Sequence, residues 1–275
     1  MNKNLELHQA IKQKQQQLAS LKEQLTDLIS RRDHLLFTKK KNLEAMYIIK
    51  IGQYEYRLAE AECSTARLKR KIALLQSQIN KGKSIDLDDI EKTLDREYRK
   101  WEQQIKQLTE QVTRADTRIK SLLPAADSRK LQKLYRKLVK ILHPDLNPVM
   151  DDKQKLLWQR LQDAYRNGDL EEVELIDMLT ASFKETDIQK NQGQLDKAIS
   201  SYQQKVRKLS DEIVTILSAF PFDIEENLKD QKWVQARVTE YNKKTKQQQQ
   251  YSHKLKIVVD TLIADHMAIG KQVEG

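Results

Sequence analysis

The chain has 275 residues, of which only 6 are Gly and 4 are Pro, and its formal net charge is +10. β-sandwiches, barrels and doubly wound sheets need a turn about every ten residues, so this shortage of turn-forming residues excludes most β architectures. Hydrophobic residues make up 39% of the chain, which is low for a domain with one thick core. The composition therefore predicts an all-α protein of long helices that bury narrow apolar seams in pairs.

The cysteine count and the hydropathy pattern exclude several further classes. Cys63 is the one cysteine of the sequence, so neither an intramolecular disulfide nor a cysteine-cluster zinc site can form. Residues 1–13 lack the apolar core of a signal peptide, and no apolar stretch approaches the roughly 18 residues that span a membrane. We therefore expect a soluble, cytoplasmic protein that is not an enzyme, has no catalytic residues and uses neither a metal nor a cofactor.

Two runs of heptad-spaced apolar residues fill positions 1–123, although the pattern of the first run blurs around 37–56. A polar break near 80–86 separates the runs, which predicts that their helices fold back as an antiparallel coiled-coil hairpin. The return helix is the shorter of the two, so the residues before about Leu43 must find another partner or project alone. We expect this overhang to mediate homodimerisation or docking.

A second coiled-coil hairpin is predicted for residues 184–275. Its first helix repeats apolar residues in the same spacing, including Leu195, Ile199, Tyr202, Val206, Leu209, Ile213 and Ile216. Pro221 disfavours helical geometry at the residue before it, so the turn should lie near 220–224.

Between the two rods, residues 124–183 lose the heptad repeat and favour shorter amphipathic helices. The first of these helices spans 129–142, where the leucines and Tyr135 share one side at about 100° per residue. The opposite side, called the basic face below, holds no acidic residue and six basic ones: Arg129, Lys130, Lys133, Arg136, Lys137 and Lys140. Like charges at this spacing repel one another, so we expect an acidic partner to bind the basic face.

The basic helix ends at His143, Pro144 and Asp145, and a second amphipathic helix over 153–166 follows this tripeptide. Residues 167–169 carry the glycine and aspartate that should close the second helix and cap a short third one.

The apolar sides of the two helices around the tripeptide need a cover. Two segments can supply it. We expect one cover from the end of the first rod, at Ile119, Leu122 and Leu123, and another from the short helix over 170–179.

Residues 129–168 resemble a J-domain, the module by which co-chaperones engage seventy-kilodalton heat-shock (DnaK-type) chaperones. The segment 131–148, LQKLYRKLVKILHPDLNP, is similar to the family's second helix and its His-Pro-Asp loop. Trp158, Leu161, Ala164 and Tyr165 match the apolar positions of the third helix. The resemblance implies that the basic face and His143, Pro144 and Asp145 bind a DnaK-type chaperone and promote ATP hydrolysis by that partner.

The chain also departs from the J-domain pattern. The family's first helix has no counterpart before Arg129, and Leu146 stands where a basic residue usually follows the tripeptide. The short helix over 170–179 is unlike the family's fourth helix, and no Gly/Phe-rich linker or cysteine-rich client-binding domain is present. The resemblance therefore implies a small, degenerate J-domain-like helical hairpin flanked by long antiparallel coiled coils.

Two alternative functions remain open at this point. A nucleic-acid binder would place phosphates on the basic face, although Tyr135 lies on the apolar side and no aromatic stacking platform interrupts the charges. A pure structural scaffold would use the central helices to join the rods, which explains the heptads but not the one-sided charge.

Overall fold

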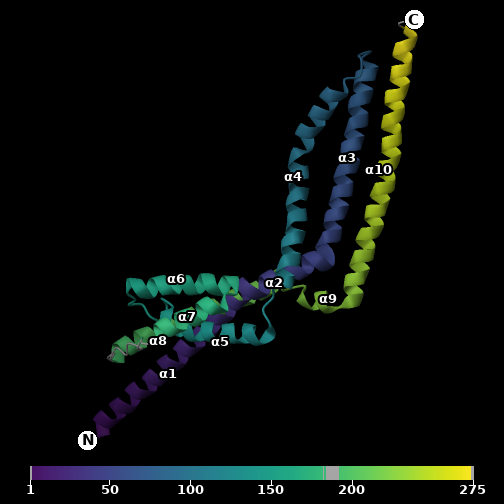
Figure 1. Cartoon of the computed structure of the whole chain (residues 1–275). Coiled ribbons are helices and arrows are strands. Elements are labelled where there is room, and N and C mark those ends of the chain that lie inside the picture. The colour runs from purple at the N-terminus through teal and green to yellow at the C-terminus, as the bar shows by residue number, and fades with distance from the viewer. Residues whose placement is uncertain (1, 182, 184–191, 274–275) are drawn as a thin grey trace. The chain divides into compact units, whose positions relative to one another are not determined.

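A computed structural model describes residues 2–181, 183 and 192–273, and throughout these residues the only regular structure is helical (Figure 1). The all-α class is therefore confirmed. The chain forms two units, Met1–Leu43 with Ser121–Ile224, and Glu44–Lys120 with Glu225–Gly275. These units differ from the three consecutive ranges predicted, 1–123, 124–183 and 184–275. Residues 184–191, where the third range begins, lie outside the described residues.

The first 80 residues are helical from Asn2 onward, and two π-helical segments interrupt the α-helical hydrogen bonding. The elements are α1 (Asn2–Asp33), η1 (His34–Lys39), α2 (Lys40–Tyr47), η2 (Ile48–Gly52) and α3 (Gln53–Asn80). A π-helical turn changes the angular position of the residues after it. The two π segments lie where the heptad pattern blurs, which explains why the seam is lost there.

The second unit consists of α3, α4 (Leu87–Lys120), α9 (Glu225–Lys229) and α10 (Gln231–Val273), together with η2. Helices α3 and α4 form the predicted antiparallel hairpin; Gly82 in their turn has a φ of 62°, and Asp86 caps α4 by accepting from Asp89 N. Helix α10 packs along the other side of α3 and runs parallel to it, since Tyr241 bonds Glu55 and Val259 packs against Leu75 (Figure 1).

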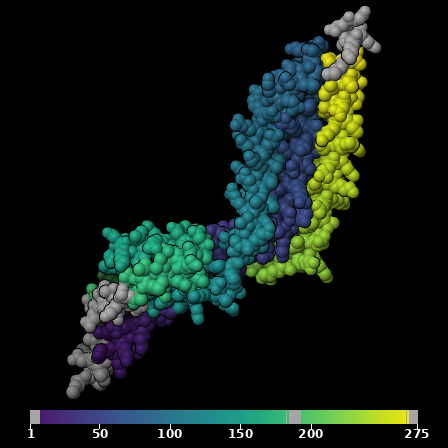
Figure 2. All heavy atoms as spheres, in the orientation of Figure 1, coloured from purple at the N-terminus to yellow at the C-terminus, as the bar shows by residue number. Residues whose placement is uncertain are grey.

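The first unit contains α1, η1, α5 (Ala125–Leu142), α6 (Asp152–Asn167), α7 (Leu170–Thr180) and α8 (Gln192–Ser218). Helix α1 packs against α5 and α8, whereas α7 packs against both α5 and α6. In the space-filling view the teal and green residues of α5–α7 form a block without visible gaps (Figure 2). The α6–α7 junction follows the expected capping, with Gly168 at a φ of 73° and Asp169 accepting from Glu172 N.

The predicted second hairpin is wrong in its pairing, although its first helix does end before the expected turn, at Ser218. Helix α8 lies parallel to α1 in the first unit, where Lys14 bonds Asp196, and α10 lies along α3 in the second. A heptad repeat marks the side of a helix that is buried but does not name the helix that buries it. The two pairs α1–α8 and α3–α10 therefore join helices that are distant in the sequence.

Two further expectations concern how the apolar sides are covered. The overhang before Leu43 finds a partner within the chain, because Leu25 and Ile29 are only 1% exposed against α5 and α8. The expectation that the end of the first rod covers the central helices is wrong for Leu122 and Leu123, since both remain exposed. Helix α7 does supply the expected cover through its buried residues Val173 and Ile176, and α1 takes the place of the rod end.

Candidate functional site at the loop between α5 and α6

Helices α5 and α6 form an antiparallel pair whose connecting loop, residues 143–151, begins with the His-Pro-Asp tripeptide. The apolar sides that the sequence predicts do face each other: Leu138, Leu142 and Leu161 are fully buried. The Tyr135 and Tyr165 rings stack with centroids 3.7 Å apart. The loop therefore rests on a closely packed core.

Asp33, which nothing in the sequence singles out, anchors α1 to this core. Its carboxylate is 1% exposed, accepts from the Tyr135 hydroxyl at 2.7 Å and pairs with Arg32 at 2.7 Å. Burial, followed by the charge and hydrogen bond of Asp33, raises the pKa of Tyr135. A buried carboxylate is tolerated only where such partners are present, so this contact specifies how α1 registers against α5.

The loop is held by hydrogen bonds of its own. His143 Nδ1 accepts from Asp145 N at 3.0 Å, and the His143 carbonyl accepts from Leu146 N and Asn147 N. The Asn147 side chain donates to the carbonyls of Lys140 and Ile141, each at 2.9 Å. These bonds satisfy carbonyls at the end of α5, which would otherwise lack partners, and all of them lie within residues 140–147.

His143 is held against the core, whereas the next two residues face solvent. The imidazole meets Trp158 edge-on, with ring centroids 4.8 Å apart, and its burial lowers the pKa of His143 to about 4. It is therefore neutral at pH 7, and an Nδ1 that accepts places the proton on Nε2. Pro144 and Asp145 are exposed. The expected three-residue contact surface is thus chiefly Pro144 and Asp145.

Two residues of α8 reach the loop. Lys205 Nζ lies 2.7 Å from Asp145 Oδ1, and the Tyr202 hydroxyl donates to the Asp145 carbonyl at 3.1 Å. Burial acts to raise the pKa of Asp145, but the hydrogen bond and charge of Lys205 outweigh it, and the pKa lies below its usual value. Leu146 is 5% exposed and belongs to the core, which gives a packing reason for an apolar residue directly after the tripeptide.

The basic face is not open in the way that the sequence suggests. Lys130 pairs with Glu174 and Lys137 with Asp177, both acids on α7. Arg136 pairs with Glu23 and Asp27 on α1, and Lys140 lies 3.8 Å from Glu23. The acidic partner that we expected from outside is therefore supplied by α1 and α7 for four of the six cations.

These ion pairs lie at the surface. The Lys130 and Lys137 side chains are 58% and 56% exposed, and that of Arg136 is 43% exposed. Exposed pairs contribute about 0–1 kcal/mol each, so the pairs of Arg136 exchange readily with another acidic group. Asp177 is only 22% exposed, so its pair with Lys137 exchanges less readily. Arg129 and Lys133 are exposed as well. The carboxylates nevertheless lower the net positive potential of the face, which weakens the case for phosphate binding there.

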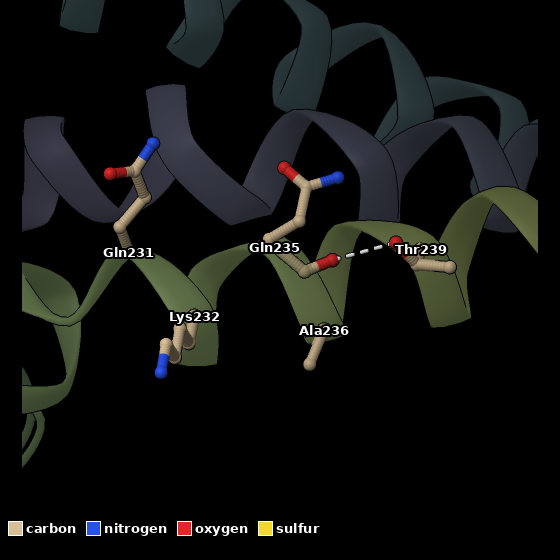
Figure 3. Close-up of a pocket in the computed structure, with 5 residues that line it drawn as sticks. All are labelled: Gln231, Lys232, Gln235, Ala236 and Thr239. Carbon is tan, nitrogen blue, oxygen red and sulfur yellow. Dashed lines mark hydrogen bonds between the residues drawn. The ribbon is translucent and has the colours of Figure 1, made fainter.

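Other features of the described residues provide no competing site. They contain no helix that is long and apolar enough to cross a membrane, and no cluster of potential ligands that could hold a metal ion. Figure 3 shows a shallow depression on the surface of α10, whose labelled residues all come from that helix: Gln231, Lys232, Gln235, Ala236 and Thr239. Thr239 Oγ1 already donates to its own helix backbone, and no convergent set of polar groups is formed.

Comparisons with known proteins give no assignment. No protein-family model, no curated protein and no solved structure matches the chain.

Proposed function

We propose that the chain is a J-domain-like co-chaperone or adaptor that engages a DnaK-type chaperone through the loop between α5 and α6. The observation that supports this proposal is the loop itself: Pro144 and Asp145 are exposed, yet hydrogen bonds to His143 and Asn147 hold their backbone rigid. A preformed loop loses little conformational entropy on binding, which favours its use as a contact surface.

The ion pairs of the basic face change how this contact would work. An open row of six cations would attract an acidic partner over long range, whereas Lys130, Arg136 and Lys137 now face carboxylates of α1 and α7. The partner's acidic groups would replace these carboxylates at small cost, because exposed pairs are weak. We therefore expect the loop to supply specificity and the basic face to supply a modest, salt-sensitive addition.

Two prolines of the same loop provide a matched test. Pro144 and Pro148 are both exposed, so Pro144→Ala and Pro148→Ala make the same chemical change at two positions about one turn apart. With a purified DnaK-type chaperone, we expect Pro144→Ala and His143→Gln to reduce stimulation of ATP hydrolysis by about tenfold or more, as for residues central to an interface. Pro148→Ala should change it less than about twofold.

Folding must be checked separately, because His143 also contacts Trp158. Far-ultraviolet circular dichroism and the urea-unfolding midpoint should therefore be measured for His143→Gln as well as for both proline variants, and both proline variants should match the wild type. Equal stimulation by wild type, Pro144→Ala and His143→Gln, or none by the wild type, would contradict the proposal.

A structural scaffold is the second candidate, favoured by the internal pairing of the basic face and by the long paired helices. In that case the loop would have no partner, and Pro144→Ala would leave every bound protein in place. Leu25→Asp, which puts a charge into the seam of α1, would instead release them, because α1 would separate from α5 and α8.

A further inference from the structure

The contact between α8 and the loop is the feature that the proposed function does not use. Lys205 Nζ forms an ion pair with Asp145 Oδ1 at 2.7 Å, and the Tyr202 hydroxyl donates a hydrogen bond to the Asp145 carbonyl at 3.1 Å. Both contacts fall on a residue that we place at the centre of the docking surface. They come from a helix 60 residues further along the chain, so they are not part of the local turn.

These contacts are not needed to shape the loop. The backbone around Asp145 is fixed by bonds within 140–147, through His143 Nδ1, the His143 carbonyl and the Asn147 amide. The buried side chain of Leu146 adds a packing anchor. Removing the Lys205 side chain should therefore leave the conformation of the loop intact and leave the Asp145 carboxylate without its ion-pair partner.

We propose that Lys205 and Tyr202 of α8 form an autoinhibitory clasp that competes with the chaperone for Asp145. This inference rests on the proposed function. A partner that binds Asp145 through a cation or a hydrogen-bond donor must first displace Lys205, and the free energy of that displacement is subtracted from the free energy of binding.

The contact between Lys205 and Asp145 is weak because both side chains are partly exposed to solvent. The side chains of Lys205 and Asp145 are 38% and 50% exposed, so water and salt screen their attraction. Competition of this size lowers the affinity for a partner by about two- to fivefold, which is the range expected for a partly exposed ion pair. The clasp therefore tunes the contact and does not abolish it.

Three variants of α8 test the clasp. Lys205→Ala removes the ion pair, Tyr202→Phe removes the hydrogen bond, and Lys208→Ala is the control, because Lys208 is an exposed lysine on the same helix. The first readout needs no partner: the Asp145 carboxyl is titrated by nuclear magnetic resonance, and hydrogen exchange is measured at Leu146 N and Asn147 N. We expect Lys205→Ala to raise the pKa of Asp145 and to leave both amides protected, and Lys208→Ala to change neither.

The second readout is the chaperone concentration that gives half-maximal stimulation of ATP hydrolysis. Lys205→Ala should lower this concentration about two- to fivefold, Tyr202→Phe should lower it less, and Lys208→Ala should leave it unchanged.

The remaining outcomes separate the two proposals. If the wild type stimulates the chaperone and Lys205→Ala stimulates it equally or less well, the clasp is wrong and the proposed function stands. If the amides of the loop lose protection in Lys205→Ala, Lys205 positions the loop and the clasp is again wrong. If neither protein stimulates the chaperone, the proposed function and the clasp both fail.

Discussion

The two units bury their helices with different residues. The core of the first unit is made of large side chains from α1, α5, α6 and α8, including the stacked pair Tyr135 and Tyr165. In the second unit α3 and α4 bury many small residues, among them Ala61, Cys63, Thr65 and Ala115. Its buried cluster of large residues is Leu75, Ile90, Leu94 and Val259.

The difference shows what a heptad repeat leaves unspecified. Both units contain helices with heptad-spaced apolar residues, but those of α8 are buried at Leu195 and Ile213, whereas the middle of α4 stays partly open at Ile105, Leu108 and Val112. Burial, and therefore the stabilisation that a leucine provides, depends on the number of neighbouring helices.

The largest expected effect is that of deleting a core leucine. Leu161 in α6 is 0% exposed, so Leu161→Ala should lower the free energy of unfolding of the first unit by about 2–5 kcal/mol. Leu108→Ala in the half-open seam of α4 should cost the second unit less than about 2 kcal/mol. Urea unfolding measures both. Trp158 reports on the first unit in a Trp101→Phe/Trp233→Phe background, and equal losses at both sites would contradict the comparison.

A titration gives the next effect. His143 has a pKa of about 4 in the folded chain, against 6.5 for a free imidazole, because it is buried. Between pH 6.5 and 4 the unfolded chain therefore binds a proton that the folded chain does not, so stability is present above pH 6.5 and is lost as the pH falls. The loss amounts to at most about 3 kcal/mol.

The control for this titration is His143→Gln, which cannot bind the proton. Its stability should fall less steeply over the same pH range. Part of the slope should remain, because burial and the charge of Lys39 also lower the pKa of His34. Identical slopes in wild type and variant would show that His143 does not carry the effect.

The third comparison removes one hydroxyl from each unit. Tyr135→Phe leaves the buried Asp33 carboxylate without its hydroxyl donor and should cost the first unit about 1–3 kcal/mol. Tyr241→Phe removes the donor to Glu55 in the second unit, where Tyr47 still donates to the same carboxylate. Its cost should be about 1 kcal/mol or less. Thermal unfolding followed by local probes measures the loss of stability in each variant. A larger loss of stability for Tyr241→Phe than for Tyr135→Phe would contradict the argument.

Local patterns in the sequence were sufficient to place most helices. Glycine and cap residues predicted the turn near 80–86 and the α6–α7 junction, because these signals act over a few residues. The pairing of α8 with α1 and of α10 with α3 was not predicted, because an apolar seam does not specify which helix will bury it. In the sequence, the only trace of the π-helical segments is that the heptad spacing of apolar residues becomes irregular around 37–56.

The candidate site could be proposed only in part from the sequence. His143, Pro144 and Asp145 and the six cations of α5 follow one another closely in the sequence, so pattern and spacing were enough to propose them. The residues that complete the site, Asp33 and Lys205, lie 102 and 60 positions from the groups that they contact. Such contacts arise from tertiary packing, and a charged residue on a long helix has no local signal that distinguishes it from a solvated one.

The smallest expected effect concerns the ion pairs. Lys137 and Asp177, whose side chains are 56% and 22% exposed, form one pair across α5 and α7, and a double-mutant cycle with Lys137→Ala and Asp177→Ala should give a coupling of about 0.2–1 kcal/mol. Arg67 on α3 is 25% exposed and contacts Glu91, Asp95 and Glu102 of α4. A guanidinium shared among three carboxylates loses less entropy per contact, so the cycle with Arg67→Ala and Glu91→Ala should give a larger coupling.

Added salt sharpens this last comparison. Screening should remove most of the Lys137–Asp177 coupling at about 1 M ionic strength, where the Debye length is about 3 Å, and should remove less of the coupling at the more enclosed Arg67. Urea unfolding of each cycle at low and high salt provides the measurement. If the Lys137–Asp177 coupling exceeds that of Arg67 and resists salt, the basic face is locked by its own carboxylates. An acidic partner could then not exchange with them at small cost, and the salt-sensitive part of the proposed docking would have to be abandoned while the contact through Pro144 and Asp145 is kept.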